Sequence, residues 1–286
     1  MTTAIRMTLL GAVMAPLLLL GAGGLSAEEL PSAITIATEG AYAPWNFSNP
    51  DGSLGGFEVE LAADLCARMK IECNVIAQDW DGLIPALMAG KFDAIMASML
   101  VTDKRLETMN FSAVYAKDGA SFVVPSDSPA VAVQAPVGNL DLSDPTAVKL
   151  IEELKPLLKG KIVGVQSATA SLAFLQKYFA DTVEIREYKT TEQHDLDLAA
   201  GRVDALFAQR TGLAATLSKP EFASFAIAGP GFVGDVFGRG VATGLRKEDA
   251  ALKAAFDAAI TAAIADGTVK ALSEKWFGAD VTPPAQ

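Results

Sequence analysis

Short runs rich in β-branched residues alternate with helical patterns along this chain, and this alternation restricts the possible folds more than any other feature. The apolar runs at 34–38, 74–77 and 92–97 read as strands. Between them, apolar residues recur every four positions over 57–69, and a shorter helical pattern covers 83–88. Because parallel strands need a crossover connection, strands separated by helices imply parallel pairing. The pattern therefore predicts an α/β lobe.

A second set of elements of the same kind follows. Strands are expected at 161–165, 183–188 and 203–208, with helices at 172–179 and 192–200 between them. The matching order of elements predicts a second lobe of like architecture.

The two sets also end alike in sequence. AGKFDAIMA at 89–97 lines up with AGRVDALFA at 200–208, and each reads as a helix stopped by Gly before a buried strand. Chance similarity over so short a stretch is the alternative, but the shared order of elements favours two related lobes.

The remaining segments connect the lobes. Residues 126–143 read as a loop, after which Asp144 as N-cap and Pro145 at the first helical position predict a helix through Leu158. The C-terminal helical patterns at 247–266 and 269–277 have no strand set of their own and are expected to pack back on an earlier lobe. The chain would then cross between the lobes twice.

These patterns divide the chain into three parts. We expect a leader at 1–27, one lobe formed by 28–117 together with 237–286, and a second lobe formed by 118–236.

The leader is the one long apolar run of the sequence. It follows Arg6 and ends in small residues up to Ala27, which is typical of a secretory signal peptide cut after Ala27. An uncleaved membrane anchor is the alternative, although the glycines and serine at 21–26 make a poor end for a spanning helix. Export would place the protein in an oxidising compartment, in which Cys66 and Cys73 should form a disulfide.

Charge and missing motifs exclude several functions. The chain has 23 Lys and Arg against 34 Asp and Glu, a net charge of −11, which disfavours nucleic acid and anionic membranes as partners. It lacks the G-x-S-x-G, H-E-x-x-H and P-loop motifs. Two Cys and one His cannot by themselves build a structural zinc site, and no cofactor is expected. His194, in an acidic helical stretch, reads as a surface residue.

A constellation of polar and aromatic residues remains at the expected strand ends. Open α/β sheets bind ligands beyond the carboxyl ends of their strands, so two facing lobes form a cleft. Arg105 and the N-H groups near Thr169 and Ala170 would hold an anion, whereas Glu39 beside aromatic rings would hold a cation. A ligand with one anionic and one cationic end would fit this set of residues. The alternative is that the aromatic rings belong to the hydrophobic core and the charged side chains are solvated at the surface. The cleft candidates are Glu39, Tyr42, Trp45, Trp80, the segment from Ser98 to Arg105, and the segment from Gln166 to Ser171.

At these residues the sequence resembles the periplasmic solute-binding proteins of ABC transporters for polar amino acids, especially the lysine/arginine/ornithine, histidine and opine binders. The resemblance covers nearly the whole chain after the leader, and the spacing of the two cysteines also matches the disulfide of the family. The segment YKTTEQHDLDL at 188–198 looks more like the opine binders. The stretches that carry the resemblance are TEGAYAPWNF (38–47), GFEVELAADLCARM (56–69), WDGLIPAL (80–87), DAIMASMLVTDKR (93–105), VGVQSATAS (163–171), GLRKED (244–249) and DGTVKALSEKWF (266–277).

The resemblance implies the two-lobed type II binding-protein fold, with a ligand cleft between lobes joined by two hinge crossings. It also implies a monomer that is not an enzyme and that delivers a small amino acid or opine to an inner-membrane ABC permease when its lobes close. Arg105 would hold the ligand carboxylate together with backbone groups from Ser98, Leu100 and Ala170. Glu39 would pair with the basic arm. The full set of implied ligand-binding residues is Glu39, Tyr42, Trp80, Ser98, Leu100, Arg105, Gln166, Ser167, Thr169, Ala170 and Gln209.

Three positions depart from the pattern of amino-acid binders. Leu100 stands where Ser is usual, Ala170 where Thr is common, and Gln209 where Asp usually neutralises the α-ammonium. Without this hydroxyl and this negative charge, a buried α-ammonium of the ligand would be poorly compensated, which costs several kcal/mol. We therefore expect an opine, such as octopine or nopaline, whose α-nitrogen is substituted. The alternatives are an ordinary lysine, arginine, ornithine or histidine binder and, more remotely, a periplasmic cyclohexadienyl dehydratase with Glu39 as general acid.

Overall fold

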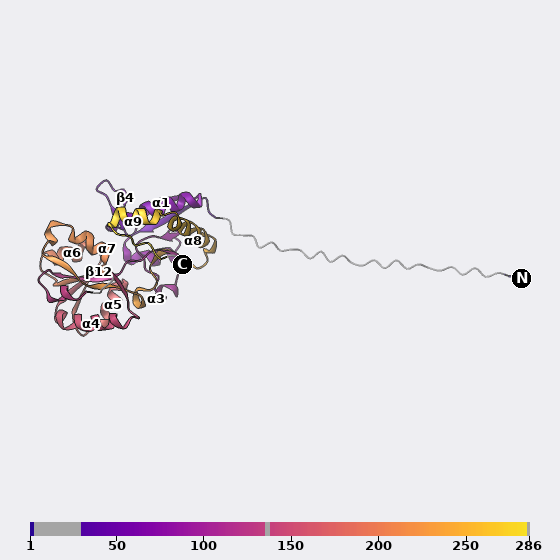
Figure 1. The fold of residues 1–286 in the computed structure, drawn as a ribbon. Coiled ribbons are helices and arrows are strands. Elements are labelled where there is room, and N and C mark those ends of the chain that lie inside the picture. The colour runs from indigo at the N-terminus through magenta and orange to yellow at the C-terminus, as the bar shows by residue number, and fades with distance from the viewer. Residues whose placement is uncertain (3–29, 135–137, 285–286) are drawn as a thin grey trace.

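The computed structural model describes residues 1–2, 30–134 and 138–284. Two open sheets, each flanked by helices, form two lobes (Figure 1). In the first sheet, a central strand pairs in parallel with two neighbours, and two further strands join antiparallel. The order of its strands is β5 (Glu72–Ala77), β1 (Ala33–Thr38), β6 (Ala94–Ile95), β14 (Val241–Leu245) and β7 (Asn110–Ala116).

The second sheet repeats the parallel core of the first. Its strand β10 pairs in parallel with β11 and β12, and β8 and β13 extend the sheet antiparallel from β12. The order of its strands is β11 (Glu184–Tyr188), β10 (Ile162–Gln166), β12 (Ala205–Gln209), β8 (Ala120–Pro125), β13 (Phe225–Val233) and β9 (Asn139–Asp141). A small third sheet joins β2 (Ala41–Tyr42), β3 (Asn46–Ser48) and β4 (Leu54–Gly55).

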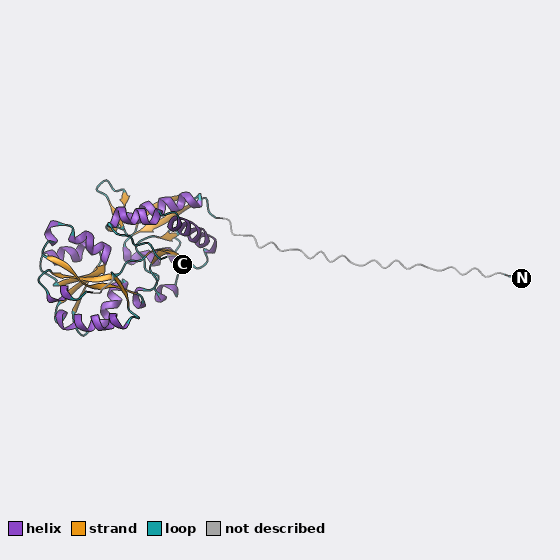
Figure 2. Ribbon diagram, in the orientation of Figure 1, coloured by secondary structure: helices purple, strands orange, loops and turns teal. Residues whose placement is uncertain are grey.

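Helices cover the faces of both large sheets (Figure 2). The first lobe carries α1 (Phe57–Met69), α2 (Leu83–Met88) and α3 (Asp103–Leu106), and the second carries α4 (Pro145–Leu158), α5 (Ala170–Tyr178), α6 (Thr191–Ala199) and α7 (Arg210–Leu217). The C-terminal helices α8 (Ala250–Ala265) and α9 (Thr268–Phe277) return to the first lobe, where both pack against α1. None of the helices in the described ranges is both long and apolar enough to cross a membrane.

The chain passes between the two sheets twice, once between β7 and β8 and once between β13 and β14. The two lobes with two crossings are the type II architecture expected from the sequence. The parallel pairings and the helix of 144–158 are also confirmed: Asp144 caps α4 by accepting a hydrogen bond from the backbone N-H of Thr146 at 2.8 Å.

Two expectations about local structure were wrong. The stretch 126–143 is not all loop, because residues 139–141 form β9 by pairing with the end of β13, a long-range partner that local sequence does not reveal. His194 is not a surface residue, since only 1% of it is exposed. It packs beneath Tyr188 and over Gly164, where a Cβ would lie only 3.2 Å from the His194 Cβ. The missing side chain at Gly164 thus makes room for the imidazole.

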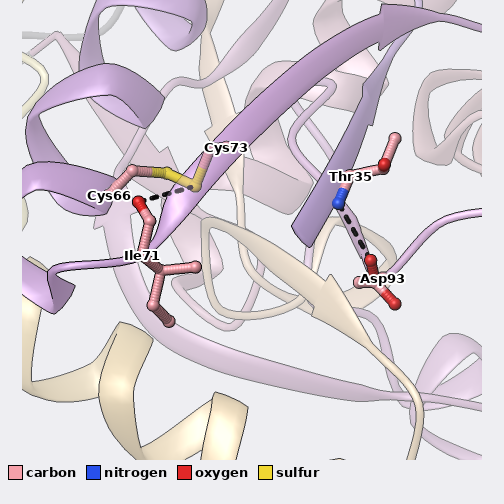
Figure 3. The surroundings of a disulfide bond; sticks show 5 residues. All are labelled: Thr35, Cys66, Ile71, Cys73 and Asp93. Carbon is pink, nitrogen blue, oxygen red and sulfur yellow. Dashed lines mark hydrogen bonds between the residues drawn. A yellow bond between two sulfur atoms is a disulfide. The ribbon is translucent and has the colours of Figure 1, made fainter. Parts of the chain in front are cut away.

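The disulfide between Cys66 and Cys73 is present and joins the last turn of α1 to the start of β5 (Figure 3). Beside it, the backbone N-H of Thr35 in β1 donates to the Asp93 carboxylate at 2.8 Å, which ties the central strand to the residue before β6. The leader expected at 1–27 lies, apart from its first two residues, outside the described residues.

Candidate functional site

A cavity of about 40 Å³ lies between the lobes, beyond the carboxyl ends of strands from both sheets. The structure brings together ten of the eleven ligand-binding residues expected from the sequence: Glu39, Tyr42, Trp80, Ser98, Leu100, Arg105, Gln166, Thr169, Ala170 and Gln209. Ser167 does not line it; its hydroxyl reaches across the cleft toward the Asp81 carboxylate at 3.5 Å. Residues that sequence reasoning did not single out also line it: Ala97, Thr191, Phe207 and Ala208. Ala97 and Ala208 directly precede Ser98 and Gln209, two predicted site residues at strand ends. The rule that ligands bind beyond the carboxyl ends of strands could therefore have included both alanines.

Arg105 stands on the short helix α3, which Thr102 caps by accepting from the Arg105 backbone N-H. Its guanidinium donates to the Leu100 carbonyl at 2.9 Å and, across the cleft, to the Ala168 carbonyl at 3.4 Å. It also lies 5.2 Å from the centre of the Trp80 ring, a cation–π distance. Loss of hydration lowers the pKa of Arg105 to about 10, and no carboxylate in the described residues offsets this loss. The group is therefore a half-buried cation without an anionic partner in the described residues.

Glu39 follows the central strand β1 and is 7% exposed. The Gln166 side-chain amide of the second lobe donates to its carboxylate at 2.7 Å. Burial raises the pKa of Glu39 to about 7; the hydrogen bond from Gln166 opposes this rise, and the nearby carboxylates Glu58, Asp81 and Asp79 add to it. No basic side chain in the described part of the chain forms an ion pair with Glu39, and none is among the main causes of this shift. Glu39 is thus the acidic counterpart of Arg105, and it lacks a cationic partner.

Gln209 ends β12 and is 8% exposed. Its carbonyl oxygen Oε1 accepts hydrogen bonds from two hydroxyls of the first lobe, Ser98 Oγ at 2.9 Å and Tyr42 Oη at 3.3 Å. Its amide nitrogen Nε2 is buried and has no hydrogen-bond partner in the described residues. Because buried donors are rarely left unpaired, we expect this N-H₂ group to donate to an acceptor on a molecule bound in the cavity.

Ser98 has an unusual backbone. Its φ angle of 49° lies in the left-handed region, and its N-H donates to the buried Glu58 carboxylate at 2.6 Å. The backbone group expected to help hold a ligand carboxylate is therefore already committed, and the hydroxyl is the group of Ser98 that crosses the cleft.

The second lobe presents the first turn of α5 to the cavity. Thr169 caps this helix by accepting from the Leu172 N-H at 3.2 Å, and Ala170 opens it. The first N-H groups of a helix lack acceptors within the helix and favour an anion. An anionic group near Arg105 would thus be met from both lobes.

Trp45 was expected at the cleft but belongs to the core. It is fully buried and packs against Phe57 and Phe277, with ring centres 5.4 and 4.7 Å away. Its indole N-H still crosses to the second lobe, donating to the Thr211 hydroxyl at 2.7 Å, and Thr211 in turn donates to Asp118 at 2.6 Å. With the bonds of Glu39 and Gln209, this contact holds the lobes in a closed arrangement.

The described ranges hold no cluster of three or more His, Cys, Asp or Glu side chains that could bind a metal ion. The cavity combines one cation, one carboxylate, aromatic walls and amide donors, which suits reversible binding of a small molecule carrying opposite charges.

Comparison with known proteins identifies the class. Residues 34–279 match the bacterial extracellular solute-binding proteins, family 3. The octopine-binding periplasmic protein of Rhizobium meliloti is 45% identical over 294 residues, which cover 96% of this chain and 99% of the relative. The L-arginine-binding protein of Pseudomonas aeruginosa is 35% identical, over 94% of this chain and 98% of that relative.

A solved structure agrees. A periplasmic His/Glu/Gln/Arg/opine family-binding protein from Silicibacter pomeroyi, in complex with lysine, superposes with a TM-score of 0.68 at 32% identity, covering 87% of this chain and 99% of that one. The chain therefore belongs to family 3 of the bacterial extracellular solute-binding proteins. Within that family it is a solute-binding protein of the ABC-importer type, and the relatives named here are themselves binding proteins.

Proposed function

We propose that this protein captures an opine of the octopine or nopaline kind in the periplasm and delivers it to an inner-membrane ABC permease. The ligand would be a derivative of a basic amino acid with at least two carboxylates, a cationic arm and a substituted α-nitrogen.

The observation that carries this proposal is the set of unpartnered groups around the cavity. Arg105 is a cation without a carboxylate, and Glu39 is a carboxylate without a cation. A ligand carboxylate at Arg105 and a cationic arm at Glu39 would compensate both charges. Because burying an uncompensated charge costs several kcal/mol, binding removes a penalty that the ligand-free closed cleft carries.

Gln209 supports the choice of an opine over a plain amino acid. An ordinary α-ammonium is a donor and needs an acceptor, but the oxygen of Gln209 already accepts from Ser98 and Tyr42. Its free Nε2 is a donor, which suits the second carboxylate of an opine. The 45% identity to an octopine-binding protein supports the same choice.

Lobe closure is the proposed mechanism of capture. The cavity of about 40 Å³ has room for a few water molecules only, because a water needs about 10–15 Å³. An amino-acid derivative must therefore enter with the lobes apart and be enclosed as they close. We take 28–117 with 237–286 as one lobe and 118–236 as the other, since each range contains the strands of one large sheet. In this proposal a monomer, exported by a leader cleaved after Ala27, presents the closed form to the permease.

Parallel calorimetric titration tests the ligand. Ligand-stripped protein is titrated with octopine, nopaline, arginine and ornithine. Opine binding at least about 100-fold tighter than arginine binding is expected if Gln209 lacks the charge for an α-ammonium. Arginine binding as tight as opine binding would instead favour an ordinary basic amino-acid binder, the candidate that the arginine-binding relative supports.

A further inference from the structure

Glu58 lies on the first turn of α1, is 1% exposed, and does not line the ligand cavity. Its carboxylate accepts hydrogen bonds from three segments far apart in sequence. The Asn46 side-chain amide donates to Oε2 at 2.7 Å, the backbone N-H of Ser98 donates to Oε1 at 2.6 Å, and the Tyr115 hydroxyl also donates to Oε1. A buried carboxylate thus joins β3, the loop after β6, and β7.

Two of these bonds lead to the cavity. Asn46 uses its other end, Oδ1, to accept from the backbone N-H of Gly40 at 2.8 Å, and Gly40 directly follows Glu39. On the other side, Ser98 is held in its left-handed conformation while its hydroxyl reaches Gln209. One carboxylate therefore fixes both loops of the first lobe that meet the ligand, one at the acidic end of the cavity and one at Gln209.

The direction of each bond requires a carboxylate at this position. The backbone N-H groups of Gly40 and Ser98 can only donate, so Asn46 must turn its oxygen to Gly40 and its N-H₂ to Glu58. Residue 58 must then accept at both of its oxygens, which an amide cannot do. Packing alone would not require the charge, and Glu60, half-buried on the same turn and paired with Lys275, already places a carboxylate near the helix N-terminus.

We propose that Glu58 is a positioning residue for ligand binding, which sets affinity by holding the Glu39 and Ser98 loops in the arrangement that receives the ligand. This inference rests on the proposed site, and its test includes a readout that needs no ligand.

The test uses Glu58→Gln, Asn46→Asp and the double variant, with Glu60→Gln as matched control. Glu58→Gln sets a donor against a donor, and Asn46→Asp sets a carboxylate against a carboxylate. Each single change is expected to weaken octopine binding, measured by calorimetry, at least about tenfold. In the double variant the new carboxylate at position 46 accepts from Gly40 and from the new amide at position 58. Its affinity should return to within about threefold of the native protein, which a merely structural loss would not do.

Thermal unfolding and amide hydrogen exchange of Gly40 and Ser98 are measured on the ligand-free variants. We expect faster exchange at both amides in each single variant, native-like exchange in the double variant, and no change in Glu60→Gln. Asn46→Asp provides the same test if Glu58→Gln does not fold. Native exchange and affinity in a folded single variant, or a double variant no better than Glu58→Gln, would overturn the inference. Faster amide exchange in the single variants, reversed in the double variant, would support the positioning role of Glu58 even if octopine, nopaline, arginine and ornithine all fail to bind. Failure of all four ligands to bind would count against the proposed function alone.

Discussion

Replacing Gln209 by Glu should reverse the ligand preference. The change keeps the oxygen that accepts from Ser98 and Tyr42 and converts the unpartnered Nε2 donor into a second carboxylate oxygen. For an opine, the variant loses a hydrogen bond to a charged group, worth about 1.5–3 kcal/mol, and gains repulsion between two carboxylates. For arginine, the variant gains an acceptor for the α-ammonium, and this hydrogen bond contributes a similar free energy to binding.

The weaker binding of the opine and the tighter binding of arginine both change the selectivity in the same direction, so their free energies add. Their sum is at least about 3 kcal/mol, so the ratio of octopine to arginine affinity should fall by about 100-fold or more. Calorimetric titration of both ligands into the native protein and Gln209→Glu measures this ratio. Gln193→Glu, the same change at an exposed position on α6, is the matched control and should leave it unchanged. An unchanged ratio in Gln209→Glu, with the variant folded, would refute the assignment of Gln209 to the second carboxylate.

Three further expectations concern charge and stability. Arg105→Ala should remove measurable binding while the melting temperature stays near that of the exposed control Arg202→Ala; native affinity in the calorimeter would contradict the carboxylate assignment. Because burial raises the pKa of Glu39 to about 7 and a cationic arm favours the ionised form, binding should release a proton below that pH and weaken by about tenfold for each unit of pH below 7. Titrations at pH 6 in buffers of different ionisation enthalpy detect that proton, and its absence would argue against pairing with Glu39. Removing the bridge with Cys66→Ser and Cys73→Ser should lower the free energy of unfolding by about 2.5 kcal/mol in urea and leave affinity unchanged, whereas a large loss of affinity would link the bridge to the site.

Local pattern predicted the parts of the fold that depend on local signals. The parallel strands β1, β5, β10 and β11 were visible as β-branched runs between helices, and Asp144-Pro145 marked the start of α4. The antiparallel strands β7, β8 and β13 were missed, because their pairing depends on partners far along the chain.

The residues of the site also divide into those that local sequence predicted and those that depend on distant contacts. Glu39 and Arg105 could be predicted because each follows a strand whose end meets the cleft. The unpartnered Nε2 of Gln209 could not, since its orientation is set by two hydroxyls more than a hundred residues away. Glu58 was equally hidden: on sequence alone it is one of several acids in a helix, and only the fold brings Asn46 and Ser98 to it.

A crystal structure of the octopine complex tests the central claim most directly, because it locates each charged group of the ligand. The account predicts one carboxylate at the Arg105 guanidinium and the first turn of α5, the cationic arm at Glu39, and the second carboxylate within hydrogen-bond distance of Gln209 Nε2. A ligand bound in the opposite direction, or with its second carboxylate away from Gln209, would contradict it.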